Sequence, residues 1–276
     1  MRIMRAPLRS SIAGFTLTEL AVVMAIVALL LGGAIYTLSA QMEQRNFEDT
    51  RRRLEQAREL LLSFALVNGR LPCPARYVSD VDHSSGGESF CTAATGACVV
   101  TTVPQAHGRC SNSYDGFLPA VALAFERQDS LKFAVDPWVN RLRYAVDAKT
   151  WQAGNTARFT RLHVSSDPTA AWSIATTPAD LVVCSQSPAT VTNVVCDANT
   201  SVTNQNTVVA LVYSTGRNGA TGGTGTNEAR NLDGNQLFVS RPPDPSGAAG
   251  GEFDDQFIWI TVGELYGKLI AAGVLP

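Results

Sequence analysis

One acidic residue, Glu19, stands at the start of a long apolar run, and it is the first position in this chain where specific chemistry is expected. After Glu19 no charged side chain occurs until Glu43, a run of 23 residues. A helix rises ~1.5 Å per residue, so this run is ~35 Å long and would cross a bilayer core of ~30 Å. A carboxylate without a partner costs about 2.5–3.5 kcal/mol on insertion scales. We therefore expect Glu19 to have a role that a simple membrane anchor would not require.

The first thirteen residues are basic, with Arg2, Arg5 and Arg9 and no acidic residue. Positive charge beside an apolar segment marks the cytoplasmic side of a membrane, so everything after Gln41 is predicted to lie outside. An ordinary secretory signal peptide is a poor alternative. Its best cleavage site, before Gln41, has Leu38 where a small residue is required.

These residues resemble the class III signal of type IV pilins and of the pseudopilins of type II secretion. The matching features are a short basic leader, Gly14 at the cleavage site, Phe15 as the first mature residue and Glu19 as the fifth. The resemblance implies that a prepilin peptidase cleaves after Gly14 on the cytoplasmic face and methylates the new amine of Phe15. It also implies that Glu19 pairs with such an amine in an assembled filament, which offsets the cost of burying the carboxylate.

A helical pattern continues beyond the apolar run to Asn68. Apolar residues recur there at spacings of three, four and seven, which marks one face of an amphipathic helix. This apolar seam consists of Phe47, Leu54, Ala57, Leu61, Phe64 and Ala65. Gly69 is the predicted end of the helix, because glycine commonly follows a helical C-terminus. The expected parts are a leader at 1–14, a transmembrane or filament-core half-helix at 15–40, an amphipathic half-helix at 41–71 and a globular region at 72–276.

After the helix the sequence predicts short strands between turns. The candidates are Arg141 to Val146, Phe159 to Ser165, Leu181 to Ser185, Val191 to Cys196, Thr207 to Ser214, Gln236 to Ser240 and Phe257 to Val262. The most apolar of them, Thr207 to Ser214, is expected at the centre of the sheet. Thr261 and Glu264 form a capping-box pattern that predicts a short closing helix. The expected fold is α+β and pilin-like, with the long N-terminal helix packed on an antiparallel β-sheet.

A short element around Trp138 is similar to a pseudopilin motif in which aspartate, tryptophan and glycine precede a tyrosine. Here Asp136, Pro137 and Trp138 are followed by Tyr144, but Val139 stands in the place of the usual glycine. We interpret Trp138 and Tyr144 as core aromatic residues. The valine leaves a different turn as an open alternative.

Six cysteines follow the apolar run, and an even number in a translocated domain indicates disulfides. Zinc is disfavoured, because no C-x-x-C occurs and the three histidines lack the spacing of metal ligands. Cys184 and Cys196 each follow a pair of valines, so we expect them to bridge neighbouring strands. The other four cysteines allow three pairings, among which the sequence alone does not choose. The pairs we favour are Cys91 with Cys98 and Cys73 with Cys110.

The glycine-rich stretch from Ser214 to Gly225 lacks the Gly-Lys-Ser/Thr ending of a phosphate-binding loop, and we do not expect it to open a helix. It is similar to the glycine-rich loop after the central strand of the major pseudopilin, which leads into a calcium site there. Calcium takes six to eight oxygen ligands. The resemblance makes Asp233, Asp254 and Asp255 candidates for calcium, while a solvated loop without a metal or other cofactor is the default expectation.

The composition excludes other functional classes. The chain has a formal net charge of −2 and 17% charged residues, so it lacks the basic stripe that nucleic-acid binding requires. An enzyme is not expected either. Ser165, His163 and Asp167 lie close together in the sequence, but no G-x-S-x-G motif supports a hydrolase.

The function that these features favour is a structural subunit, a minor pilin or pseudopilin, which assembles through its N-terminal helix for secretion or pilus biogenesis. The expected partners are prepilin peptidase, other pilin or pseudopilin subunits, the inner-membrane assembly platform and membrane lipid, with no nucleic acid. The chain is expected in the inner membrane, with one span and a periplasmic head, from which it can be extracted into a filament. The alternative is a filament-borne adhesin or DNA-uptake receptor that uses the disulfide-rich region.

Overall fold

The structure is a computed structural model of the 276-residue chain. It describes residues 14, 16–77, 86–151, 156–161, 179–190, 194–204, 206–223, 225–245, 247–248 and 250–274. The chain divides into two compact units, Met1–Arg45 and Asn46–Pro276, and we call the second the head unit. The leader, apart from Gly14, lies outside the described residues, and so does Phe15.

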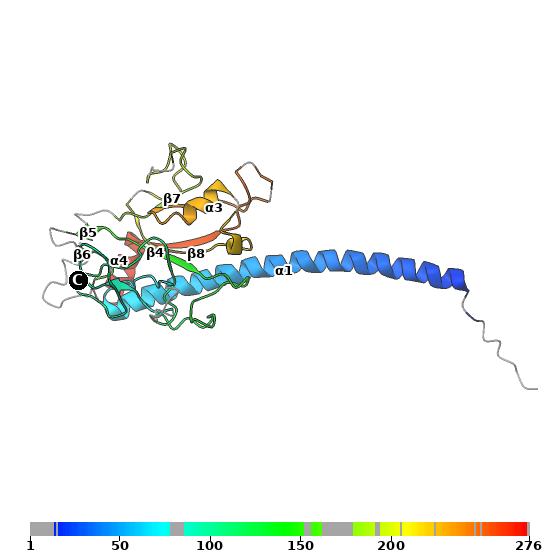
Figure 1. The fold of residues 1–276 in the computed structure, drawn as a ribbon, viewed down its shortest axis with the longest axis horizontal. Helices are drawn as coiled ribbons and strands as arrows, with labels where there is room; N and C mark the ends of the chain where they lie inside the picture. The colour runs from blue at the N-terminus through cyan, green and yellow to red at the C-terminus, as the bar shows by residue number, and fades with distance from the viewer. Residues whose placement is uncertain are drawn as a thin grey trace, which may run out of the picture. The chain divides into compact units, whose positions relative to one another are not determined.

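A single helix, α1 (Leu17–Asn68), spans both predicted half-helices except for their outermost residues (Figure 1). It continues through Gly32 and Gly33 without interruption. The helix ends where the sequence predicts, because Gly69 adopts a left-handed φ of 64° and its N–H donates to the carbonyl of Ala65 at 2.9 Å. Within the part of the chain that the structure describes, no helix has the length and apolar character needed to span a bilayer.

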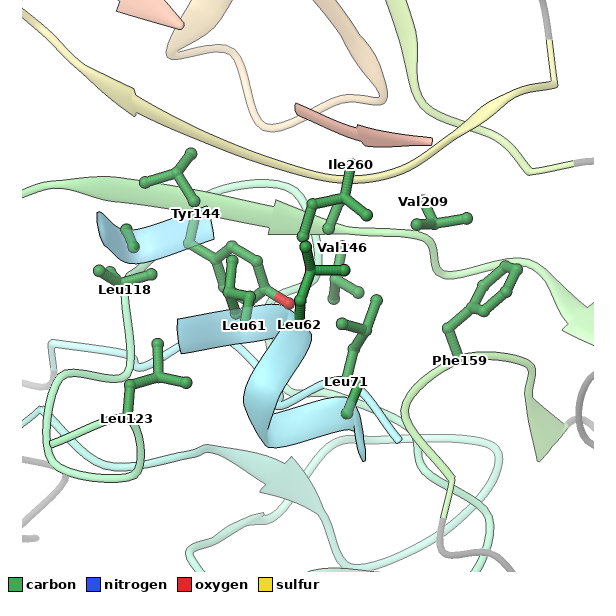
Figure 2. Packing of buried hydrophobic residues seen from close by; sticks show 14 of the residues in the cluster. Leu61, Leu62, Leu71, Leu118, Leu123, Tyr144, Val146, Phe159, Val209 and Ile260 are labelled. Atoms are coloured by element: carbon green, nitrogen blue, oxygen red, sulfur yellow. The ribbon is translucent and has the colours of Figure 1, made fainter. Parts of the chain in front are cut away.

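The predicted seam of α1 forms the base of the main core in the head unit. Leu54, Ala57, Leu61 and Ala65 are fully buried, and Phe64 packs partly buried against them. Figure 2 shows Leu61 and Leu62 packed against side chains of the sheet, among them Tyr144. Each buried leucine stabilises the fold by about 1.5–3 kcal/mol relative to an exposed one, so this contact holds the sheet on the helix.

A four-stranded antiparallel sheet lies on α1, with the strand order β10-β8-β4-β3. Its strands are β3 (Gly116–Phe117), β4 (Arg143–Val146), β8 (Val208–Ser214) and β10 (Gln256–Thr261). All seven residues of β8 are buried, and the strand pairs with β4 on one side and β10 on the other. The prediction of a central strand here is therefore confirmed, as is the α+β class.

A second layer covers the other face of this sheet. It contains β7 (Val182–Cys184) and β9 (Leu237–Val239), which pair in parallel, and the short helix α3 (Thr226–Asn231) (Figure 1). Aromatic side chains join the layers, because Phe238 of β9 lies 5.7 Å from the ring of Tyr213. The parallel pairing differs from the all-antiparallel expectation. It arises because the chain crosses the main sheet as β8 before it returns as β9, and such a crossover gives parallel strands.

Smaller elements complete the head unit. They are β1 (Phe90–Cys91), β2 (Val100–Thr101), β5 (Thr150–Trp151), β6 (Thr156–Ala157), the 3₁₀ turn η1 (Gly219–Thr221) and α4 (Val262–Ala271). The N-cap of α4 is the predicted one, since the N–H of Glu264 donates to the hydroxyl of Thr261 at 3.2 Å. The Glu264 carboxylate pairs with Arg58 of α1 at 2.5 Å, which ties the closing helix to the seam.

Three local predictions are wrong. Phe159 lies in a turn rather than a strand, and the segment to Ser165 continues outside the described residues. Val194 to Cys196 form no strand, so the disulfide of Cys184 joins a strand to a loop. The glycine-rich stretch does precede a helix, since α3 begins at Thr226 with Gly225 as its N-cap.

The turn at Val139 keeps a conformation suited to glycine even though a β-branched residue occupies it. Val139 has a φ of 70° and is 72% exposed. The turn is held from several sides, because Asp136 accepts hydrogen bonds from the N–H of Asn140 at 2.8 Å and from the hydroxyl of Ser214 at 2.7 Å. A β-branched residue at positive φ is strained by about 1–3 kcal/mol.

We predict that Val139→Gly stabilises the protein, because removing the side chain relieves this strain at a small cost in chain entropy. The expected gain is about 1 kcal/mol, or a rise of about 2–4 °C in Tm for a domain of this size. Thermal unfolding of the purified chain measures it. Val103→Gly is the matched control, because Val103 is also exposed but has no positive φ. The control should lower Tm, and a similar fall in Val139→Gly would contradict the strain.

Candidate assembly and processing site

The predicted cleavage position, Gly14, is exposed and imposes no packing requirement on the described chain. A Cβ added to Gly14 would meet no other atom within 4 Å. Its φ is not in the left-handed region that favours glycine. The fold therefore gives no reason for glycine at this position.

Glu19 caps the N-terminus of α1. The N–H of Thr16 donates to Glu19 Oε2 at 2.9 Å, and the Thr16 hydroxyl donates to the same oxygen at 2.8 Å. In return, the N–H of Glu19 donates to Thr16 Oγ1 at 3.3 Å. This reciprocal arrangement is a capping box, which satisfies two of the amide groups that a helix start leaves unpaired.

Sequence reasoning missed this contact although its signal was present. Threonine followed three residues later by glutamate, just before an apolar run, is the sequence signature of a capping box. The structure thus brings Glu19 together with Thr16, one residue beyond the predicted first mature residue. These bonds hold the carboxylate at the N-terminal end of α1.

The helix after Glu19 is apolar on all of its sides. Every residue from Thr16 to Gly32 is exposed, and the exposed side chains include Leu20, Met24 and Leu29. An exposed apolar patch on a helix marks a surface that contacts lipid or protein. This half of α1 therefore presents an apolar surface that the described residues leave uncovered.

Comparison with known proteins agrees with these features. Residues 9–35 match the family model described as the prokaryotic N-terminal methylation motif. The chain therefore carries the signature of the prepilin-type signal found in type IV pilins and pseudopilins. No curated protein and no solved structure is significantly similar to the chain. The match is confined to the N-terminal segment, where it supports a prepilin-type processed subunit.

The six cysteines form three disulfides in the structure. The pairs are Cys73–Cys110, Cys91–Cys98 and Cys184–Cys196, the same pairs that the sequence analysis favours. The first joins the segment after α1 to the loop before β3, which closes a 37-residue separation. Such a link stabilises the fold chiefly by restricting the unfolded chain, by about 2–4 kcal/mol.

A second group of functional candidates is an acidic cluster in the head unit. Glu228 lies in α3, and Asp254 and Asp255 are consecutive residues just before β10. Each of the three places a carboxylate oxygen within 4.8 Å of the other two. All three are buried, with exposed fractions of 1%, 5% and 5%. The sequence analysis named Asp254 and Asp255 but missed Glu228. Asp233 does not join them, because it pairs with Arg230 at 2.7 Å.

The glycine-rich loop wraps around this acidic cluster. A Cβ on Gly216 would lie 2.1 Å from Asp254 Oδ1, and a Cβ on Gly223 would lie 2.6 Å from Glu228 Cβ. Both glycines also have positive φ values. The glycines are needed here because the backbone must pass close to the carboxylates, which explains the composition of the loop better than phosphate binding does.

Amide groups satisfy part of the acidic cluster. The N–H of Arg217 donates to Asp254 Oδ2 at 2.9 Å, and the amide of Asn231 donates to Asp255 Oδ2 at 2.7 Å. Asp254 Oδ1 is buried and receives no hydrogen bond from the described residues. Such an oxygen is costly unless a proton or a cation reaches it.

The electrostatics of the acidic cluster favour protonation when no cation is bound. Burial raises the pKa of Asp254 to about 6, and the charges of Glu228 and Glu252 add to the effect. Burial, with the charges of Glu228 and Asp254, raises the pKa of Asp255 to about 8. The charged forms of Asp254 and Asp255 are thus disfavoured unless a compensating charge is present.

We predict that the head unit loses stability as pH rises in the absence of divalent cations. Because both folded pKa values exceed the unfolded ones, the native state binds more protons than the unfolded state between about pH 4 and pH 8. Stability therefore falls as pH rises across that range and levels off above it. In EDTA, Tm at pH 8.5 should be lower than at pH 5.5 by at least about 3 °C.

Two variants test the assignment of this pH dependence. Asp255→Asn should flatten it, because the amide has no charged form. Asp233→Asn should leave it unchanged, because Asp233 pairs with Arg230 outside the acidic cluster. Equal pH profiles for wild type and Asp255→Asn would show that other groups control the stability.

Proposed function

We propose that this chain is a structural subunit, a minor pilin or pseudopilin, which prepilin peptidase processes and which assembles into a type IV filament through α1. The observation that carries the proposal is the methylation motif at residues 9–35. The second part of this motif lies in α1, where the helix after Glu19 exposes apolar side chains on all sides. In this proposal the peptidase cleaves after Gly14 and methylates the amine of Phe15. The remaining partners are other pilin-like subunits and the inner-membrane assembly platform.

The proposed location is the inner membrane, with the N-terminus in the cytoplasm and the head unit in the periplasm. The basic leader supports the orientation, because positive residues stay on the cytoplasmic side. Three disulfides in the head unit support an oxidising compartment. The exposed apolar side chains of α1 would contact lipid before assembly and neighbouring helices afterwards.

Glu19 supplies the polar contact for assembly in this proposal. Its carboxylate would pair with the N-methylated amine of an adjoining subunit, because two opposite charges in an apolar setting offset each other's desolvation. The capping box holds the carboxylate at the helix end without using both of its oxygens, since the bonds with Thr16 involve Oε2. Capping and pairing are therefore compatible.

We predict that the charge of Glu19, rather than its capping bond, is needed for assembly. Glu19→Gln keeps a side-chain oxygen for the cap but removes the charge, whereas Thr16→Val removes the capping hydroxyl and keeps the charge. Co-purification of other pilin-like subunits should fall about tenfold or more for Glu19→Gln, because 1.4 kcal/mol corresponds to a factor of ten. Thr16→Val should stay close to wild type.

Mass spectrometry of the same samples tests processing separately. The mature chain should begin at N-methylated Phe15 in the wild type and in both variants. A start at Met1 or near Gln41 would contradict the proposed processing. If processing is normal and Glu19→Gln co-purifies like wild type, the pairing role of Glu19 is wrong.

We also propose that the acidic cluster of Glu228, Asp254 and Asp255 binds calcium. The observation that favours it is the buried Asp254 Oδ1, which the described residues leave without a partner beside two other carboxylates. Carboxylate oxygens are the ligands that calcium prefers, and the amide oxygen of Asn218 is a further unpaired oxygen next to Glu228. A bound cation would replace the protons that the raised pKa values indicate.

We predict that calcium stabilises the protein at pH 7.5. At about 100 times its Kd, a ligand adds about 2.7 kcal/mol, which corresponds to several degrees in Tm. Differential scanning calorimetry with calcium or EDTA measures the shift. Asp254→Asn should abolish it and Asp233→Asn should retain it. A wild-type Tm that does not respond to calcium would refute this site.

A further inference from the structure

The main sheet has one open edge, formed by β10. Within the described ranges β10 pairs only with β8. The opposite edge is closed, because Ala75 forms a bridge with Phe117 of β3, with hydrogen bonds of 2.8 Å in both directions. The two edges of the sheet thus differ in whether the chain itself covers them.

The hydrogen-bond alternation shows which groups of β10 face outward. The N–H of Asp147 donates to the carbonyl of Val209, so the odd-numbered residues of β8 face β4 and the even-numbered ones face β10. The register places Ile258 opposite Val212, which makes Ile258 a residue that bonds to β8. Its neighbours in β10 must turn their backbone groups to the outside.

These outward residues are Phe257 and Trp259. Their N–H groups donate to no residue that the structure describes, and their carbonyl groups accept no hydrogen bond from one. Their side chains, in contrast, are well placed, since Phe257 stacks on Tyr213 with ring centroids 4.8 Å apart. The strand is therefore held firmly in place while one row of its backbone donors and acceptors stays available.

This edge lacks the features that normally prevent pairing with other strands. The sequence of β10, Gln-Phe-Ile-Trp-Ile-Thr, contains no charged residue and no proline. Its only register shift lies at the far end, between Ile260 and Thr261. Natural proteins usually protect an open edge with charges, proline or a bulge, because an uncharged edge is a template for another strand.

A groove of 450 Å³ runs along the beginning of this edge. Gln256 to Ile258 form one part of its lining. The rest of the lining comes from α1 and from the segment after β9, and it includes two basic and two acidic residues: Phe47, Arg51, Leu54, Glu55, Ser240, Arg241, Pro243 and Asp255. The beginning of the edge, Gln256 to Ile258, thus lies in a groove shared with α1 and with the segment after β9.

We propose that this groove binds an extended peptide segment of another protein, which adds to β10 as a fifth strand. Main-chain hydrogen bonds to Phe257 and Trp259 would provide the affinity, as in other cases of strand addition. The middle of the segment is uncharged, to match β10. Arg51 is available to bind a flanking acidic side chain, because its present ion pair with Glu55 is exposed and contributes little.

Two other occupants fit the groove poorly. A helix has already satisfied its backbone groups internally, so it cannot pair with the edge. In a second copy the same residues of α1 and of the segment after β9 flank the beginning of β10. They would collide with their counterparts before the two edges could pair. An extended segment has free backbone groups that can pair with the edge, and it can enter the groove without a folded domain attached beside it.

Residue-resolved hydrogen exchange on the full-length chain in detergent tests the proposal. The probe is a synthetic peptide with the sequence of β8, Val208 to Ser214, because this sequence already pairs with β10 in the fold. Glutamates flank it, in keeping with the acidic side chain proposed to bind Arg51. In the chain alone, the amides of Phe257 and Trp259 should exchange rapidly. Those of Ile258 and Ile260 should exchange slowly. With the peptide in excess, exchange at 257 and 259 should slow by about tenfold or more.

The matched control is the same peptide with an N-methyl group on every amide, which cannot donate to the edge and should give no protection. Slow exchange at Phe257 and Trp259 in the chain alone would overturn the proposal, because the edge would already be covered. Exchange unchanged by an excess of the unmethylated peptide would also overturn it. The experiment requires no filament, so its outcome does not depend on the proposed assembly.

Discussion

The head unit depends on the burial of one seam of α1 against the sheet. Leu54, Ala57, Leu61 and Ala65 lie at the bottom of the main core, and strands β4, β8 and β10 all contribute side chains to the same cluster. Truncating a buried leucine such as Leu61 to alanine typically costs about 2–5 kcal/mol, out of a total stability of about 5–15 kcal/mol. The earlier turns of the same helix have no comparable contact, since residues 16–32 are exposed. One half of this helix therefore holds the folded head, while residues 16–32 make no comparable contact with the described residues.

The acidic cluster shows how the same fold carries a polar group that it does not fully satisfy. The carboxylates come from α3 and from the residues just before β10, and the glycine-rich loop reaches them only because Gly216 and Gly223 lack a Cβ. Backbone and side-chain amides supply several hydrogen bonds, but amides do not neutralise charge. The raised pKa values of Asp254 and Asp255 express that deficit. A proton or a divalent cation would compensate this negative charge. Protonation would make the stability of the head unit depend on pH, and cation binding would make it depend on the concentration of the cation.

How much of this was predictable depends on whether the signal is local in sequence. The features of Gly14 and Glu19, the end of α1 at Gly69 and the buried strand β8 follow from patterns within a few residues, and the structure agrees with the helix end and the strand. Glu228 was missed because its role depends on Asp254, 26 residues away, and nothing near Glu228 marks it. The parallel pairing of β7 with β9 was missed for the same reason. Val139 is a different case, since its neighbours hold the turn against the preference of valine itself.

The capping box connects the local and the long-range requirements on Glu19. A carboxylate in an apolar helix is costly because it loses water, and the Thr16 amide and hydroxyl return part of that solvation from within the same chain. The amide and hydroxyl of Thr16 cannot neutralise the negative charge of Glu19, because neither group is cationic. In the proposed function the missing charge arises only when cleavage after Gly14 creates an amine at Phe15, one residue before the cap. Processing and assembly would then be linked by electrostatics, because an uncleaved chain has no cationic amine at this position to offer to the Glu19 of its neighbour.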